Sequence, residues 1–88
     1  MAGMIGGDLG QMQTLATQLA RASEEVRTLQ STITNGVLGT SWTGPASNRF
    51  RDAWNGQYKS NLQQLQDALT QLSAEVKNRR TALENASA

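Results

Sequence analysis

The chain of 88 residues contains neither cysteine nor histidine. Without cysteine it has no disulfide framework, no thiol nucleophile and no thiolate ligand for a metal. Without histidine it lacks the commonest general base and the commonest metal ligand. We therefore expect no metal site and no other cofactor.

Large hydrophobic side chains are also scarce. Hydrophobic residues make up 38% of the sequence and aromatic residues only 5%, which is little material for a core in so short a chain. Small domains with thin cores are usually stabilised by disulfides, by metals or by oligomerisation. Because the composition excludes the first two, oligomerisation is the expected remedy.

Charge and hydropathy exclude further classes of protein. Eight basic and seven acidic residues give a formal net charge of +1, which argues against a protein whose affinity comes from nucleic-acid phosphates. No apolar run approaches the roughly 18 residues of a membrane span. The start of the chain has no basic region followed by an apolar run, so we expect no cleaved signal peptide. Synthesis in the cytoplasm is expected, and export would need another route.

The first half of the chain carries a helical pattern. Asp8 is a candidate N-cap, and Asn35-Gly36 is a candidate stop because both residues tolerate a left-handed backbone. Between them, apolar residues recur at heptad a and d spacing for about three and a half heptads. They are Met12, Leu15, Leu19, Ala22, Val26, Leu29 and Ile33. The pattern predicts a first helix at residues 8–35.

A second helical pattern begins at the only proline, Pro45, which suits the first position of a helix. Phe50, Trp54 and Tyr58 follow at spacings of four, so a helix would place their rings along one side. Apolar residues then continue at spacings of three and four. They are Leu62, Leu65, Leu69, Leu72 and Val76.

The two patterns predict one all-α domain over residues 1–88, an antiparallel two-helix hairpin. A turn at 36–44 joins the first helix to a second helix at 45–83, and a loose tail follows at 84–88. Both apolar stripes have the narrow width of a coiled-coil seam, and they pack against each other. Since the core is thin, we expect two hairpins to pair into a four-helix bundle.

The four aromatic residues all fall between positions 42 and 58. Trp42 lies in the predicted turn, where small polar residues are usual. One interpretation is that Trp42 folds back as a lid over the open end of the hairpin, on Phe50 or Val37. The other is that it belongs to a surface recognised by another protein, since exposed tryptophan is a frequent interface anchor.

The sequence Trp42-Thr43-Gly44, at mid-chain with a helix predicted on each side, resembles the WXG family. These are the ESAT-like small proteins of the bacterial type VII (ESX) secretion system. The following segment from Pro45 to Phe50 is similar to the stretch that opens the family's second helix. The resemblance covers most of the chain.

The resemblance implies a non-enzymatic protein that works through its partners. It implies that the hairpin pairs antiparallel with a second copy or with a sister WXG protein. It implies recognition by an FtsK/SpoIIIE-type ATPase through Trp42 and Gly44, supported by Phe50, Trp54 and Tyr58. Made in the cytoplasm of a bacterium, the protein would be secreted without a cleaved signal peptide.

One element of the family pattern is missing. Members carry a C-terminal Tyr-x-x-x-Asp/Glu export signal, whereas the only tyrosine here is Tyr58, followed four residues later by Leu62. Either a sister subunit supplies the signal or this member uses another element of its tail, and the departure favours a sister partner. A homodimer stays open, because nothing in the stripes encodes the choice of partner.

The remaining polar residues argue against an enzyme and against a nucleic-acid-binding protein. The carboxylates are scattered over polar faces, and no phosphate-binding loop or activated nucleophile is present, so we expect no enzyme. Lys77, Arg79 and Arg80 suit the C-terminal end of a helix dipole better than a nucleic acid. Gly56 within the second helix indicates either close approach of another element or a tolerated surface residue. The alternative function is a cytosolic coiled-coil adaptor or chaperone unrelated to secretion.

Overall fold

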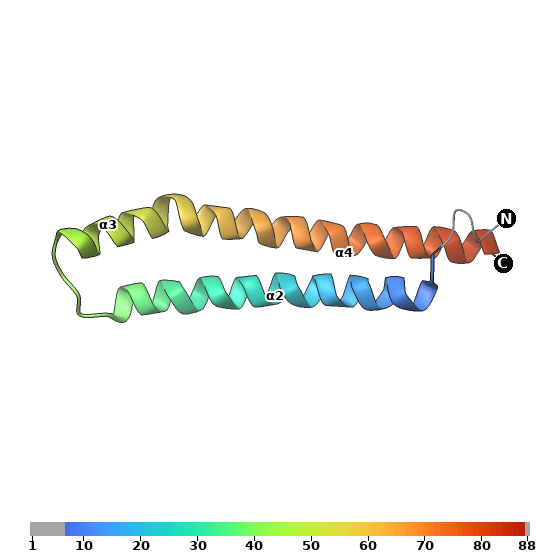
Figure 1. Ribbon diagram of the computed structural model, residues 1–88, viewed down its shortest axis with the longest axis horizontal. Coiled ribbons are helices and arrows are strands. Elements are labelled where there is room, and N and C mark those ends of the chain that lie inside the picture. The colour runs from blue at the N-terminus through green and yellow to red at the C-terminus, as the bar shows by residue number, and fades with distance from the viewer. Residues whose placement is uncertain (1–6, 88) are drawn as a thin grey trace.

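The structure, a computed structural model, describes residues 7–87 as a long helical hairpin (Figure 1). One rod is α2 (Leu9–Gly39), and the other is formed by α3 (Pro45–Ala53), the π-helical turn η1 (Trp54–Tyr58) and α4 (Lys59–Ser87). The rods lie side by side and antiparallel, with extents of 65 × 17 × 14 Å. The predicted all-α hairpin is confirmed, while residues 1–6 and 88 of the expected domain lie outside the described residues.

Helix α2 begins where its cap predicts and ends later than expected. The Gln11 backbone N–H donates to Asp8 Oδ1 at 2.8 Å, which confirms Asp8 as the N-cap. The helix does not stop at Asn35-Gly36 but continues to Gly39. The predicted stop relied on a left-handed backbone at Asn35-Gly36, but within residues 7–87 only Gly44 has a positive φ. The helix ends instead at the C-cap Thr40, which has an extended backbone. The turn therefore shrinks from the predicted 36–44 to residues 40–44.

Helix α4 also extends beyond its predicted end. It continues to Ser87, where the sequence predicted a loose tail at 84–88, of which residue 88 lies outside the described part. Arg80 contacts both this added turn and α2. Its Nη1 lies 2.9 Å from Glu84 Oε2, and its Nε donates to the Leu9 carbonyl across the hairpin at 3.0 Å. The Arg80 side chain thus connects the first residue of α2 to the last turns of α4, at the same end of the hairpin (Figure 1).

The π-helical turn η1 spans two of the three aromatic residues of the second rod. The Lys59 N–H donates to the Trp54 carbonyl five residues back, so one turn holds an extra residue, and the second rod bends there in Figure 1. Trp54 is only 4% exposed, whereas Phe50 is 46% and Tyr58 is 51% exposed. The three rings therefore differ in burial, and the extra residue shifts the helical phase between Trp54 and Tyr58.

Gly56 lies within this turn. An added Cβ would meet no atom within 4 Å. Close approach of another element therefore does not explain this glycine within the described chain. The structure instead agrees with the alternative of a tolerated surface residue.

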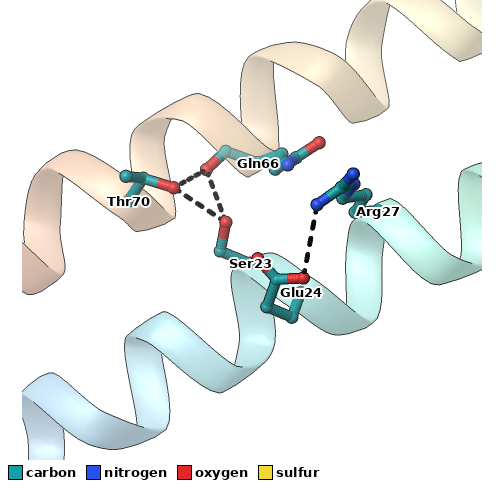
Figure 2. A network of polar contacts seen from close by, with 5 residues as sticks. All are labelled: Ser23, Glu24, Arg27, Gln66 and Thr70. Atoms are coloured by element: carbon teal, nitrogen blue, oxygen red, sulfur yellow. Dashed lines mark hydrogen bonds and ion pairs between the residues drawn. The ribbon is translucent and has the colours of Figure 1, made fainter.

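The contact between α2 and α4 is made by small and polar residues at its tightest points. Figure 2 shows Ser23 Oγ pointing across to α4, 2.8 Å from Thr70 Oγ1 and 3.2 Å from the Gln66 carbonyl. Ser73 Oγ donates to the Ala16 carbonyl at 2.8 Å. Among the described residues, the only buried hydrophobic side chains are Ala16 and Trp54. The hairpin alone thus has almost no hydrophobic core.

Candidate functional site

The turn around Trp42 depends on the backbone of one glycine. Gly44 is the N-cap of α3 and has φ 118° and ψ 176°, a region that essentially only glycine occupies. A Cβ at this position would meet no atom within 4 Å. The requirement for glycine therefore comes from backbone conformation and not from crowding.

Two residues of α3 hold this turn in place. Ser47, which is 1% exposed, donates from Oγ to the Trp42 carbonyl at 2.8 Å. Arg51 donates from Nε to Ser47 Oγ at 3.0 Å, and from Nη2 to the carbonyls of Thr40 and Trp42 at 3.1 Å each. Neither Ser47 nor Arg51 was predicted as a site residue. Their only signal is a serine and an arginine four residues apart, directly after the glycine.

Trp42 lies at the turn end of the hairpin, between α2 and α3, and remains half exposed. Its ring lies 6.2 Å from that of Phe50 with an interplanar angle of 47°. A pocket of about 250 Å³ is lined by Ile33, Gly36, Val37, Thr40, Trp42, Phe50 and Arg51. Trp42 is nevertheless 44% exposed. It therefore covers part of the hairpin end, as a lid would, and still offers apolar surface to another protein.

Trp54 has a different position from Trp42. Its indole Nε1 donates to Thr34 Oγ1 of α2 at 3.1 Å, and its ring is buried between the rods. The structure thus brings Trp42, Gly44 and Phe50 together at the turn. Trp54 joins the two rods, and the exposed Tyr58 lies at the far end of η1.

The predicted packing residues divide into two sets. One set is half buried along the contact between the rods and comprises Met12, Leu19, Val26, Ile33, Leu62, Leu69 and Val76. The other set is exposed, with Leu15 at 44%, Leu29 at 47%, Leu65 at 47% and Leu72 at 45%. The predicted stripes are therefore only partly covered by the partner helix of the same chain.

The four exposed leucines share one side of the hairpin. Because Ala16, Ser23 and Ser73 occupy the line of contact, Leu15, Leu29, Leu65 and Leu72 fall at the heptad position that flanks this line. In an antiparallel helix pair, these flanking positions of both helices lie on the same side. We call this surface the leucine face.

The opposite side is polar. Thr70 and Lys77 of α4 line a groove with Ala20, Ser23 and Glu24 of α2. On this side the Glu24 carboxylate lies 3.8 Å from Arg27, with both side chains more than two-thirds exposed (Figure 2). Such surface ion pairs contribute little to stability. The hairpin is thus amphipathic as a whole.

The area exposed by the chain is large for its size. It exposes 6430 Å², whereas a compact monomer of its 9.5 kDa mass exposes about 5,000 Å². The difference of roughly 1,400 Å² reflects the elongated shape of a single hairpin with few buried side chains.

Two further properties concern residues 7–87 only. No described helix is long and apolar enough to cross a membrane. The described acidic residues form no group of three or more that could hold a metal ion.

Comparison with protein families matches residues 5–87 to WXG100, described as "Proteins of 100 residues with WXG". Since the match covers nearly the whole chain, the chain belongs to the WXG100 family. Members of this family are small helical proteins associated with type VII secretion. No curated protein and no solved structure matches the chain in the corresponding searches.

Proposed function

We propose that the chain is a non-enzymatic substrate or secretion-coupled partner of a type VII (ESX) secretion system. It acts through two contacts with other proteins. The leucine face pairs with a second hairpin, and the turn around Trp42 is recognised by the system's FtsK/SpoIIIE-type ATPase. The protein is made in the bacterial cytoplasm and leaves the cell without a cleaved signal peptide.

The pairing half of the proposal is supported by the exposed leucines. Leu15, Leu29, Leu65 and Leu72 remain exposed, and a second amphipathic hairpin would bury them in a four-helix bundle. The second hairpin is another copy of the chain or a sister WXG protein. Burial of these leucines supplies the hydrophobic core that the single hairpin lacks.

The recognition half is carried by one observation. In a chain of the WXG100 family, Trp42 is held half exposed on a turn that requires Gly44. Tryptophan is enriched among residues that contribute most to protein interfaces. A fixed turn also presents it with little loss of conformational freedom on binding.

Export of a Trp42→Ala variant tests this proposal. The wild-type chain is expected in the culture supernatant of cells with the secretion ATPase and not of cells from which it is deleted. Trp42→Ala is expected to keep its helix content by circular dichroism and to lose export. Thr43→Ala serves as the matched control, because its side chain is exposed in the same turn, and it is expected to be exported normally.

Two results would contradict the proposal. Normal export of Trp42→Ala would remove the recognition role of the tryptophan. Retention of the wild-type chain in cells with an intact type VII system would instead favour a cytosolic adaptor or chaperone.

A further inference from the structure

We propose that Ser47 and Arg51 are positioning residues that fix Trp42 in its half-exposed pose for recognition. This inference rests on the proposed function, because it concerns the same turn. It assigns a role to two residues that need not touch the partner themselves. We call them the Ser47–Arg51 pair.

The turn has few other contacts that could fix the tryptophan. Among the described residues, its own backbone hydrogen bonds are Trp42 N–H to the Thr40 carbonyl at 2.9 Å and Asn48 N–H to the Gly44 carbonyl at 3.0 Å. The only ring near the indole is that of Phe50, at 6.2 Å. Gly44 adds conformational freedom beside it. The direction of the indole must therefore be set largely through the backbone of Trp42.

The Ser47–Arg51 pair acts on that backbone. The Trp42 carbonyl accepts from both Ser47 Oγ and Arg51 Nη2, at 2.8 and 3.1 Å. The same Nη2 reaches the Thr40 carbonyl, so one guanidinium connects two positions of the turn. Arg51 is itself oriented by its Nε bond to Ser47 Oγ. The hydroxyl thus accepts from the arginine and donates to the tryptophan carbonyl.

Every hydrogen bond that Arg51 forms with other described residues belongs to this arrangement. Within residues 7–87 the arginine has no carboxylate partner, whereas Arg27 and Arg80 each pair with a glutamate. The planar guanidinium places several donors in a fixed geometry, which a lysine ammonium does not reproduce. The exposed Arg49, two residues earlier, forms no hydrogen bond or ion pair with another described residue. It provides a matched control of equal charge.

The test compares Arg51→Lys and Ser47→Ala with Arg49→Lys. Binding of each purified chain to the cytosolic part of the secretion ATPase is measured by calorimetry, in the presence of the paired hairpin. The indole N–H signals of the two tryptophans are followed by NMR. Arg51→Lys and Ser47→Ala are expected to weaken binding about tenfold or more, the equivalent of one or two lost hydrogen bonds. Arg49→Lys is expected to bind as the wild type does.

The NMR signals separate positioning from a merely structural role. In both pair variants the Trp42 indole signal is expected to shift or broaden, while the Trp54 signal and the circular dichroism spectrum stay unchanged. If Ser47→Ala does not fold, Arg51→Lys decides the question, because it keeps the charge and leaves the buried serine intact.

Different failures have different meanings. Wild-type binding by Arg51→Lys, with binding lost in Trp42→Ala, overturns the positioning role and leaves the proposed function standing. Weakened binding with an unchanged Trp42 signal also overturns it, because Arg51 would then contact the ATPase directly. Wild-type binding by Trp42→Ala itself overturns the proposed function.

Discussion

Replacing Gly44 by alanine tests whether the turn around Trp42 depends on backbone conformation alone. The substitution adds a Cβ in open space, since no atom lies within 4 Å of its position. Its cost comes from holding a non-glycine residue at φ 118°, which is worth about 1–3 kcal/mol. For a domain of this length, the melting temperature should fall by about 4 °C or more.

Gly36 is the matched control for this substitution. A Cβ there also meets no atom within 4 Å, but the residue lies within α2 with ordinary helical backbone. Gly36→Ala should therefore raise stability by about 0.5–1 kcal/mol, the usual gain from replacing glycine within a helix. Both substitutions restrict the unfolded chain in the same way, so that effect cancels. The two variants should therefore differ by about 1–3 kcal/mol, the cost of the backbone conformation at position 44.

Thermal and urea denaturation followed by circular dichroism measure this difference. All samples must have the same protein concentration, because the stability of a pairing protein depends on it. Equal stabilities of Gly44→Ala and Gly36→Ala would refute the account of the turn. So would a stabilised Gly44→Ala variant.

Two other substitutions test the contacts between the rods. Trp54→Phe keeps a ring between the rods but removes the hydrogen bond to Thr34. Urea denaturation should show that the free energy of unfolding falls by about 1–2 kcal/mol. Wild-type stability would mean that this bond contributes nothing. Ser73→Leu enlarges a side chain that is 5% exposed beside the fully buried Ala16, so overpacking should lower stability by about 1–3 kcal/mol. An unchanged melting temperature for Ser73→Leu would show that the helices are not in close contact there.

Much of the fold could be predicted because helical periodicity is local and long in this sequence. The apolar spacing gave both long helices, while Asp8 and Pro45 marked two of their starts. The stop at Asn35-Gly36 was not realised, because glycine permits a helix end without enforcing one. The turn η1 was not predicted from the sequence. An extra residue in a helical turn depends on tertiary packing, here that of Trp54 against the other rod.

The candidate site was predicted in part. The motif itself pointed to Trp42 and Gly44. The structure explains why position 44 is glycine, because its backbone has a positive φ. Ser47 and Arg51 were missed because their roles depend on where the turn carries the Thr40 and Trp42 carbonyls. Serine and arginine near the start of a helix otherwise look like surface residues.

Both stripes were predicted to pack against each other, and only part of each, including Leu19, Leu62 and Leu69, lies half buried along the contact between the rods. The sequence suggested that leucines of one helix meet leucines of the other. In the structure, Ala16, Ser23 and Ser73 make the closest contacts, and Leu65 and Leu72 remain exposed. Small residues are hard to recognise as contact residues from hydrophobic periodicity, although their size is what lets two helices approach closely.

The proposed pairing predicts that this hairpin is stably folded only when a second hairpin covers its leucine face. Light scattering coupled to size exclusion, with circular dichroism on the same fractions, tests it directly. We predict that the helical species has twice the 9.5 kDa mass of one chain, or contains a sister hairpin, and that helicity is lost on dilution to monomer. A cooperatively folded 9.5 kDa monomer across micromolar concentrations would contradict the claim.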